Sequence, residues 1–484
     1  MTTPSIYWHD YETFGADPAW DRPAQFAGVR TNEALEIIGE PLVLYCKPAN
    51  DRFPTPLACL ITGITPQLAL EKGMPEAEFI AKIHRELTQP GTCGAGYNSI
   101  RFDDEVTRNC LYRNFYDPYA REWRNGNSRW DIIDLLRLTR ALRPEPINWP
   151  DNDQGLPSFR LEEITRANGI EHHGAHDALV DVYATIAVAR LVRERIPKLY
   201  SYLYQLRKKS QVSPLLNLEQ AQPVLHVSSK YPAQEGCIAL VAPLVRHPMN
   251  PNGILVYNLA KDPSLLIEGG IEEIRLSLFT PRQELSTKSE RVALKTVHLN
   301  KCPVVVPLKT LRDPDAKRLG IDPDQCMRNR SRILAVPGIR EKIAEIFSRP
   351  PDNPCDDPDL MIYSGGFFSE ADREKLNAIR TAGADALAAI PDHFEDRRLP
   401  KMLFRYRARN FPESLSELER QCWENYRMQQ LRHPQGSKNA LNPSAYRAEI
   451  QHLRKNSESF RNSHDILDAL EAWADRLLSP DPKP

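Results

Sequence analysis

The sequence predicts an α/β layer fold over about the first 190 residues, then a small antiparallel β-domain and a mostly helical C-terminal part. Strand-like and helix-like segments alternate in the first part, as in proteins that stack helices on a sheet. Short apolar runs separated by Pro, Gly and Asn turns follow between residues 237 and 308, a pattern typical of antiparallel strands. Beyond residue 358 apolar residues recur at helical spacing.

The first part contains several expected strands and helices. Asn168-Gly169 predicts a helix end, because both residue types tolerate the left-handed backbone found there. The longest helix should bury one stripe that includes Val182, Tyr183 and Ile186. The expected strands are 5–8, 41–46 and 92–98, and the expected helices are 76–87, 104–114, 158–167 and 178–196.

A polar segment and a proline-rich segment divide the second and third parts of the chain. Residues 208–236 are polar and predict a loop, whereas 349–358 (RPPDNPCDDP) contains four prolines and predicts a domain boundary. We therefore expect domains at 1–196, 197–350 and 353–484. The expected later strands are 237–245, 253–260, 292–300 and 302–308, and the expected later helices are 330–347, 370–387, 414–431, 443–455 and 463–478.

Composition excludes several classes of protein. A chain of 484 residues is too long for one core, which predicts two or three domains. The net charge of −1 excludes a uniformly basic nucleic-acid binder, so any phosphate contacts must come from local patches. The nine scattered cysteines form no CxxC pair, which argues against a zinc site or disulfide framework. No apolar run is long enough to span a membrane, so we expect a cytoplasmic protein without membrane contact.

Acidic residues are the first sign of chemistry. Asp10 and Glu12 end an expected strand, and residues two apart on a strand point to the same face. Two carboxylates on one face can hold hard cations. Asp103 lies at a strand-to-helix junction, and His176 and Asp181 lie at the start of a long helix. Each group has an ordinary alternative, namely a surface loop, helix capping or an exposed histidine.

The order of these residues removes most of that ambiguity. A DxE near the N-terminus, an aspartate in a YNxxFD setting and an HxxxxD motif resemble the DnaQ-like (DEDDh) exonucleases, whose fold is of the ribonuclease H type. The resemblance implies that two Mg²⁺ ions, with Mn²⁺ as a substitute, are bound by carboxylates and that His176 is the general base. The implied metal ligands are Asp10, Glu12, Asp103 and Asp181.

Longer phrases narrow the resemblance. WHDYETFG (8–15), YNSIRFDDEVTRN (97–109) and YRARNFP (406–412) are similar to the bacterial exonuclease I family. That family implies an exonuclease domain, an SH3-like domain and a helical C-terminal domain. It further implies a monomer that degrades single-stranded DNA processively from the 3′ end to 5′-mononucleotides, in DNA repair or recombination. The C-terminal tail of single-stranded DNA-binding protein is the implied protein partner.

Several residues are candidate DNA contacts. Arginines and aromatic residues alternate between positions 101 and 143, and such mixtures grip phosphates and stack bases. Arg160 precedes an expected helix and is a candidate for holding a phosphate or the terminal nucleotide. The alternatives are buried aromatic rings and solvated arginines. Arg108, Tyr119, Trp123 and Arg137 are expected to be exposed. The candidate substrate contacts are Glu12, Arg108, Tyr119, Trp123, Arg137 and Arg160.

Three basic stretches lie outside the first domain, at 207–209, 328–332 and 404–409. They are either solvated faces or the far wall of a channel around one strand. Arg143, Arg312 and Arg332 are candidates for receiving the acidic tail of the protein partner. No GxxxxGK[ST] loop is present to drive translocation with ATP.

Three other functions fit the sequence less well. An RNA-directed 3′→5′ exonuclease on the same core would typically be one short domain, whereas more than half of this chain follows the core. A non-catalytic nucleic-acid-binding scaffold would have lost at least one of the five site residues, and none is lost. A proofreading subunit predicts a short tail rather than two further domains.

Overall fold

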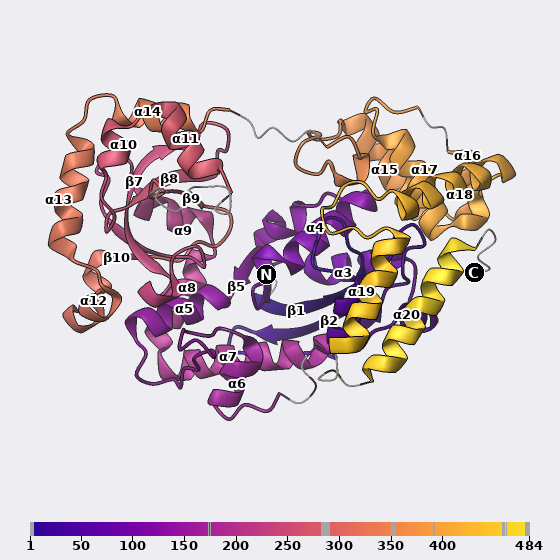
Figure 1. Cartoon of the computed structure of the whole chain (residues 1–484), viewed down its shortest axis with the longest axis horizontal. Coiled ribbons are helices and arrows are strands. Elements are labelled where there is room, and N and C mark those ends of the chain that lie inside the picture. The colour runs from indigo at the N-terminus through magenta and orange to yellow at the C-terminus, as the bar shows by residue number, and fades with distance from the viewer. Residues whose placement is uncertain are drawn as a thin grey trace. The chain divides into compact units, whose positions relative to one another are not determined.

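The computed structural model describes residues 4–172, 174, 176–281, 291–349, 355–390, 393–456, 460 and 462–479. They divide into two compact units, drawn together in Figure 1. The first unit comprises Met1–Ser128, His172–Ile186 and Asn353–Pro484, and the second comprises Arg129–Glu171 and Ala187–Asp352. The expected boundary at residues 350 and 353 lies outside the described residues. The helical C-terminal part thus belongs to the same compact unit as the N-terminal strands.

The first unit contains four neighbouring strands of a mixed sheet, in the order β3-β2-β1-β4. The central strand β1 (Ser5–Thr13) runs antiparallel to β2 (Pro23–Asn32) and parallel to β4 (Thr92–Gly96). β3 (Leu42–Tyr45) pairs antiparallel with β2, and the unit boundary falls at the start of β5 (Ser128–Asp131). β1 continues five residues beyond the expected 5–8, to Thr13, so Asp10 and Glu12 lie inside the strand.

Helices cover this sheet with apolar faces. α3 (Glu76–Leu87) buries Phe79 and Ile83 against Tyr11 and Phe26 of the sheet. Their spacing places these apolar residues on one stripe of the helix. α3 matches its predicted bounds. The other helices in the N-terminal half of this unit are α1 (Pro56–Thr62), α2 (Pro66–Lys72), α4 (Asp103–Arg113) and α7 (Ala178–Arg195), the last of which belongs to this unit as far as Ile186.

The C-terminal helices pack directly on the N-terminal part of the first unit. Tyr446 and Leu467 share one hydrophobic cluster with Phe14 and Leu60. The C-terminal helices are α15 (Glu370–Thr381), α16 (Ala384–Ala389), α17 (Leu399–Asn410), α18 (Glu417–Arg432), α19 (Pro443–Asn456) and α20 (Ser463–Leu478). The expected helix 370–387 is divided at Gly383, and α17 was not predicted.

The second unit contains an antiparallel sheet with the order β10-β6-β7-β8-β9. All four predicted strands form, and the additional strand β6 lies inside the expected loop 208–236. The strands are β6 (Val224–Val227), β7 (Ile238–Arg246), β8 (Gly253–Asn258), β9 (Leu294–His298) and β10 (Val305–Pro307). The helices are α5 (Ile133–Leu142), α6 (Leu161–Ala167), α8 (Pro197–Leu206), α9 (Lys209–Val212), α10 (Ser264–Glu268), α11 (Ile271–Phe279), α12 (Asp313–Leu319), α13 (Pro323–Leu334) and α14 (Ile339–Ile346).

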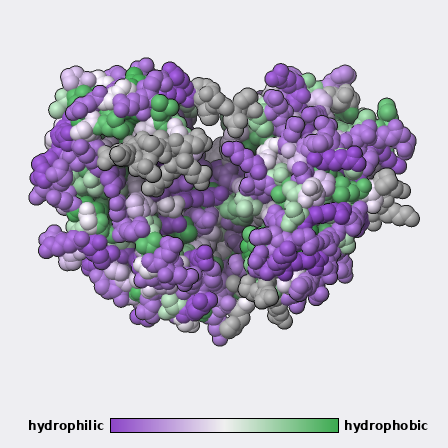
Figure 2. All heavy atoms as spheres, viewed as in Figure 1, coloured by the Kyte–Doolittle hydropathy of each residue, from purple (hydrophilic) through white to green (hydrophobic). Residues whose placement is uncertain are grey.

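The surface is largely polar. Figure 2 shows a mostly hydrophilic face with small hydrophobic groups scattered over it. Tyr183 on α7 is exposed, which contradicts its expected place in the buried stripe, whereas Val182 and Ile186 are buried as predicted. In the part of the chain that the structure describes, none of the helices combines the length and the apolar composition of a membrane span.

Candidate active site

Two acids of β1 begin the candidate site. Asp10 pairs with Ala27 and Glu12 pairs with Gln25 across the β1–β2 ladder. The two acids are two residues apart on the strand and therefore lie on the same face of the sheet. The side-chain amide of Gln25 joins this ladder to α7, because its Oε1 accepts a hydrogen bond of 3.2 Å from the backbone N–H of Ala178. The start of α7 is thereby fixed beside the strand that carries the acids.

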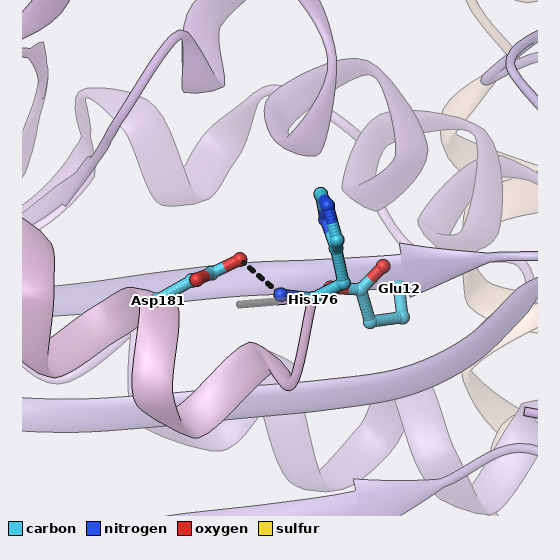
Figure 3. Close-up of side chains that lie close together, drawn as sticks. All are labelled: Glu12, His176 and Asp181. Atoms are coloured by element: carbon cyan, nitrogen blue, oxygen red, sulfur yellow. Dashed lines mark hydrogen bonds between the residues drawn. The ribbon is translucent and has the colours of Figure 1, made fainter. Parts of the chain in front are cut away.

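The first turn of α7 brings a third acid to β1. Asp177 accepts a hydrogen bond of 3.0 Å from the N–H of Leu179, which is the capping role expected of a first-turn acid. Asp181 follows one turn later, and its Oδ2 accepts a hydrogen bond of 3.3 Å from the backbone N–H of His176 (Figure 3). His176 has a positive φ of 72°, unusual for a residue other than glycine.

These elements create a group of potential metal ligands. One ligand atom each from Glu12, His176 and Asp181 lies within 4.8 Å of the other two (Figure 3). Carboxylate oxygens are the donors preferred by Mg²⁺ and Mn²⁺. The two carboxylates of this group therefore fit a hard divalent cation.

Asp103 and Asp10 lie outside that closest group but interact with it, through a hydrogen bond and through their charges. Asp103, the first residue of α4, is buried, and its Oδ1 accepts a hydrogen bond of 3.0 Å from the backbone N–H of Tyr11. Tyr11 lies between the two acids of β1, so this bond holds Asp103 against them. Burial and the negative charges of Asp103, Glu12 and Asp181 raise the pKa of Asp10 well above its usual range.

The same crowding affects Glu12. Burial, followed by the charges of Asp181, Asp103 and Asp177, raises the pKa of Glu12 to about 9. Carboxylates that share a site without a cation repel one another and retain protons. A divalent cation would replace those protons and remove the repulsion. The electrostatics of the four acids are thus those expected of a metal-binding cluster.

The site also contains a second histidine, His172, which sequence reasoning did not reveal. The Nε2 of His172 lies 2.6 Å from Oδ1 of Asp181, and the His172 side chain is almost wholly buried. Its position in the loop before α7 could have attracted attention, but no spacing rule marks a residue nine positions before a carboxylate. Asp181 is therefore held at both oxygens, by His172 and by the backbone of His176.

The expected exposure of two arginines is wrong. Arg108 is only 3% exposed, because its guanidinium pairs with Glu122 at 2.7 Å and with Glu105 at 2.9 Å. Arg137 is 8% exposed and pairs with Asp134 at 2.5 Å. Both arginines neutralise acids of the fold itself, which leaves little of either guanidinium for a phosphate.

The remaining DNA-contact candidates have different surroundings. Trp123 is 63% exposed, with the guanidinium of Arg124 5.3 Å from its ring centre. Tyr119 is half-buried, and its hydroxyl donates to the carbonyl of Ile362 over 3.3 Å. Arg160 belongs to the second unit, and its exposed side chain lies 3.6 Å from Glu163. The roles of these residues toward DNA stay predictions.

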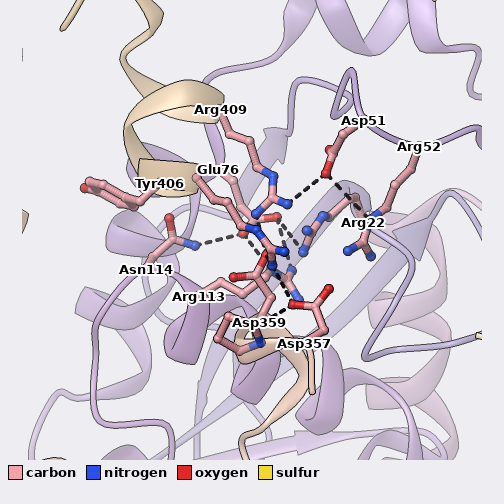
Figure 4. A network of polar contacts seen from close by, with 12 residues as sticks. Arg22, Asp51, Arg52, Glu76, Arg113, Asn114, Asp357, Asp359, Tyr406 and Arg409 are labelled. Atoms are coloured by element: carbon pink, nitrogen blue, oxygen red, sulfur yellow. Dashed lines mark hydrogen bonds and ion pairs between the residues drawn. The ribbon is translucent and has the colours of Figure 1, made fainter. Parts of the chain in front are cut away.

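The basic stretch 404–409 is not the solvated face or channel wall that was expected. Arg405 and Arg407 are buried on α17, and Arg409 is largely covered in ion pairs (Figure 4). Arg409 pairs with Asp51 and with Asp359, at 2.8 Å in each case. Arg405 pairs with Asp359 at 3.1 Å. These pairs join the C-terminal helices to the N-terminal part of the first unit.

Basic residues of the second unit are also engaged. Arg312 bonds Asp315 at 2.6 Å and Glu145 at 2.7 Å, and Arg143 lies 3.6 Å from Asp315. Arg332 pairs with Asp262 at 2.8 Å. Unlike the arginines of α17, the Arg312 and Arg332 side chains remain substantially exposed. They stay candidates for a protein contact.

Comparison with known proteins agrees with this site and fold. Three family models match in succession: Exonuclease at residues 7–189, Exonuclease I SH3-like domain at 207–349 and Exonuclease I C-terminal domain at 356–477. These models confirm the predicted fold class, an exonuclease domain of the ribonuclease H type followed by SH3-like and helical domains.

Relatives and solved structures extend over nearly the whole chain. Exodeoxyribonuclease I of Escherichia coli is 50% identical over 426 residues, which cover 88% of this chain and 89% of that protein. The structure of exonuclease I from Methylocaldum szegediense matches with a TM-score of 0.93 and 55% identity, covering 98% of this chain and all of that one. E. coli exonuclease I with a dA16 oligonucleotide matches with a TM-score of 0.93 and 46% identity, with coverage of 98% and 100%. This chain therefore belongs to the exonuclease I family of exodeoxyribonucleases.

Proposed function

We propose that this enzyme hydrolyses the terminal phosphodiester at the 3′ end of single-stranded DNA, using two divalent cations and a histidine base. The metal ligands are Asp10, Glu12, Asp103 and Asp181, with Mg²⁺ as the cation and Mn²⁺ as a substitute. The observation that carries the proposal is the convergence of Glu12, His176 and Asp181 ligand atoms within 4.8 Å. Glu12 also contacts the terminal nucleotide in this proposal.

The chain's own groups have distinct tasks in the reaction. When bound, the cations make a coordinated water acidic and neutralise charge on the scissile phosphate. His176 accepts the proton of the attacking water, since an imidazole can take up a proton near neutral pH. The water oxygen forms a bond to phosphorus while the bond from phosphorus to the 3′ oxygen of the preceding nucleotide breaks. The products are a 5′-mononucleotide and a strand shortened by one residue.

The position of His176 suits a base that is not itself a metal ligand. Its backbone N–H is bonded to Asp181, so the main chain is fixed to the acid cluster. The residue itself is exposed. The ring can therefore exchange protons with solvent between turnovers. The opposing arrangement, in which His176 contacts a phosphate as a cation, would retain activity at low pH.

Substrate and partner follow from the relatives. E. coli exonuclease I has been solved with single-stranded DNA and zinc, and exonuclease I has been solved with SSB and an inhibitor. We propose single-stranded DNA as substrate and the tail of single-stranded DNA-binding protein as partner of Arg143, Arg312 and Arg332. We further propose a processive, cytoplasmic monomer active in DNA repair or recombination. The domain boundaries 1–196, 197–350 and 353–484 belong to the same proposal.

The remaining substrate contacts are those that stay accessible. Trp123 and Arg160 are exposed, and Tyr119 is half-buried. We propose that these side chains contact the strand. Arg108 and Arg137 support neighbouring elements through their ion pairs and take no direct part.

The decisive experiment follows release of nucleotides from strands labelled at either end. With Mg²⁺, the wild-type enzyme should release mononucleotides from the 3′ end alone, and EDTA should stop the reaction. Asp181→Asn should lower the rate by at least about 100-fold, because removing a direct ligand should exceed the 10- to 100-fold cost of removing a residue behind one. Asp177→Asn is the matched control, since asparagine also caps helices.

Two outcomes would overturn the proposal. Activity of Asp181→Asn equal to that of Asp177→Asn would remove Asp181 from the metal site. Equal degradation of matched DNA and RNA strands would remove the preference for DNA.

A further inference from the structure

Arg22 directly precedes β2 and is buried without the hydrogen bonds that a buried guanidinium requires. Its side chain is only 4% exposed. Among the described residues, none accepts a hydrogen bond from any of its three guanidinium nitrogens. The carboxylate with which it pairs is that of Glu76, 3.9 Å from Nη1. Because a charged group that loses water without gaining acceptors is costly to bury, Arg22 calls for a further acceptor.

Glu76 is already bonded by other residues. Nε and Nη2 of Arg113 each donate to its carboxylate over 3.2 Å. The side-chain amide of Asn114 donates to the same group over 2.8 Å (Figure 4). The bidentate pair with Arg113 is the stronger arrangement for a guanidinium and a carboxylate. Two guanidinium groups thus share one carboxylate, and Arg22 is the one left outside hydrogen-bonding distance.

The acids farther along this buried network are bonded by other arginines. Asp51 and Asp359 are both bonded by Arg409 at 2.8 Å. In the described part of the chain, ion pairs of 4.0 Å or less connect five guanidinium groups and four carboxylates around Arg22. They belong to Arg22, Arg52, Arg113, Arg405 and Arg409, and to Asp51, Glu76, Asp357 and Asp359. The network therefore has one positive charge in excess.

A small cavity opens beside this excess charge. Its volume is about 20 Å³, and about 10 to 15 Å³ is enough to hold one water molecule. The space suits one water or a monatomic anion and is too small for a phosphate or a carboxylate. Arg52 also lines it, and the buried Nε of Arg52 has no hydrogen-bond acceptor among the described residues. The residues around the cavity include Phe14, Asp21, Arg22, Arg52, Phe53 and Pro54.

We propose that a chloride ion binds in this cavity, beside the guanidinium groups of Arg22 and Arg52. A single anion accepts hydrogen bonds from several N–H groups at once and supplies the missing negative charge. A water molecule is the competing occupant. It could donate to the buried Oδ1 of Asp51, which has no donor in the described part of the chain. Water carries no charge, however, and would leave the excess of the network in place.

Asp21 is the acid that opposes an anion in the cavity. Its carboxylate lies at the cavity wall, where Oδ2 accepts a hydrogen bond of 2.9 Å from the backbone N–H of Asp17. Burial raises the pKa of Asp21 to about 6. The group is therefore largely ionised near neutral pH, and its charge limits how tightly an anion is held. Asp21→Asn should bind chloride more tightly than the wild type does.

Bromide gives a direct test because it replaces chloride and scatters X-rays anomalously. Crystals of the full chain are grown or soaked in sodium bromide, and data are collected at the bromine absorption edge. We expect an anomalous peak in hydrogen-bonding contact with Arg22. Bromide peaks elsewhere with none at Arg22, or a water in the cavity that gives no anomalous signal, would overturn the proposal.

Thermal unfolding tests the same site in solution. The Tm is measured in sodium chloride and in sodium gluconate of equal ionic strength, since gluconate is too large for the cavity. The gain from chloride over gluconate should be about 2 to 4 °C greater in the wild type than in Arg22→Gln, because an anion bound only by the folded state raises Tm. It should be greater still in Asp21→Asn.

Arg420→Gln, on the exposed side of α18, is the matched control and should show the wild-type gain. A gain as large in Arg22→Gln as in the wild type would contradict the proposal, as would a smaller gain in Asp21→Asn. If Arg22→Gln does not fold, the bromide map of the wild type decides alone. Neither measurement involves DNA or a divalent cation, so the result is independent of the proposed function.

Discussion

His172 and Asp181 are directly bonded, with 2.6 Å between the histidine Nε2 and the carboxylate Oδ1. The histidine is almost wholly buried and lies before α7, whereas the aspartate lies in the first turn of the helix. Residues that bond to a metal ligand from behind fix the orientation of that ligand. The pair thus connects the loop before α7 to the geometry of the proposed metal site.

His172→Ala should weaken Mg²⁺ binding, with about 10- to 100-fold lower metal affinity or activity, because Asp181 loses a partner that orients it. The measurement is the rate of DNA degradation against Mg²⁺ concentration. High Mg²⁺ should restore a substantial part of the rate in this variant. Asp181→Asn should show no such recovery, and identical Mg²⁺ curves for His172→Ala and wild type would contradict the prediction.

Glu12→Gln should stabilise the metal-free enzyme at alkaline pH. The pKa of Glu12 is raised from 4.5 to about 9 in the folded state. Between these two pH values the folded protein therefore keeps a proton on Glu12 that the unfolded chain has released. Stability from this group is therefore full below the unfolded pKa and falls as the pH rises toward the folded pKa. The variant, which cannot ionise here, should have the higher Tm at pH 8 in EDTA, by about 2 to 8 °C for a gain near 1 to 2 kcal/mol.

Added Mg²⁺ should reverse that order. The wild type should gain more in Tm than Glu12→Gln does, since it offers one more anionic ligand. The test compares the Tm of the wild type with that of Glu12→Gln at pH 6 and pH 8, with EDTA and with Mg²⁺. A variant whose Tm responds to Mg²⁺ as strongly as the wild type would remove Glu12 from the ligand set.

Arg409→Ala should destabilise the protein by about 3 to 5 kcal/mol, because it removes from the buried carboxylates of Asp51 and Asp359 the cation that bonds both at 2.8 Å. Urea unfolding gives this value. Arg420→Ala, on the exposed side of α18, is the control and should change stability by no more than about 0.5 kcal/mol. Similar losses in the two variants would contradict a special role for the Arg409 pairs.

Acid should destabilise the protein through a second buried ion pair, that of Glu76 with Arg113. Burial opposes ionisation of Glu76, but the charges of Arg113 and Arg22 outweigh it and lower its pKa to about 2. A depressed folded pKa gives stability that is present above the unfolded pKa and lost as the pH falls toward the folded value. The wild type should therefore lose stability between about pH 4.5 and pH 2, and Glu76→Gln should flatten that loss.

Arg108→Ala should reduce stability rather than electrostatic binding of DNA. The change leaves Glu105 and Glu122 facing each other in a largely buried place, at a cost of about 3 to 5 kcal/mol if both remain ionised. The slope of log affinity against log salt should stay unchanged, because no phosphate contact is lost. A slope shallower by about one unit would instead identify Arg108 as a phosphate contact.

The sequence predicts the site better than it predicts the whole scaffold. The order of acids and one histidine identifies the cluster because exonuclease chemistry constrains residue types at fixed positions. α3 and α20 match their predicted bounds, since each buries one clear stripe. β2 was missed because nearly all of its residues are buried, so no alternation of polar and apolar residues marks it as a strand.

α17 shows a second limit of prediction from sequence. Its arginines look like a solvated basic face, yet Arg409 bonds acids that lie 358 and 50 positions earlier in the chain. Nothing local to the helix indicates those partners. His172 is hidden for the same reason, because its contact with Asp181 depends on how the loop folds before α7.

The cluster that joins Phe14 and Leu60 to Tyr446 and Leu467 has a consequence for how this protein is made. A ribosome synthesises the strand with the candidate catalytic acids first and the helices that cover its neighbours last. Until Leu467 emerges, those N-terminal apolar side chains lack their native cover. The nascent chain thus carries its nuclease residues long before it can hold them firmly, and a chain cut short before α19 should be a substrate for proteases rather than a smaller nuclease.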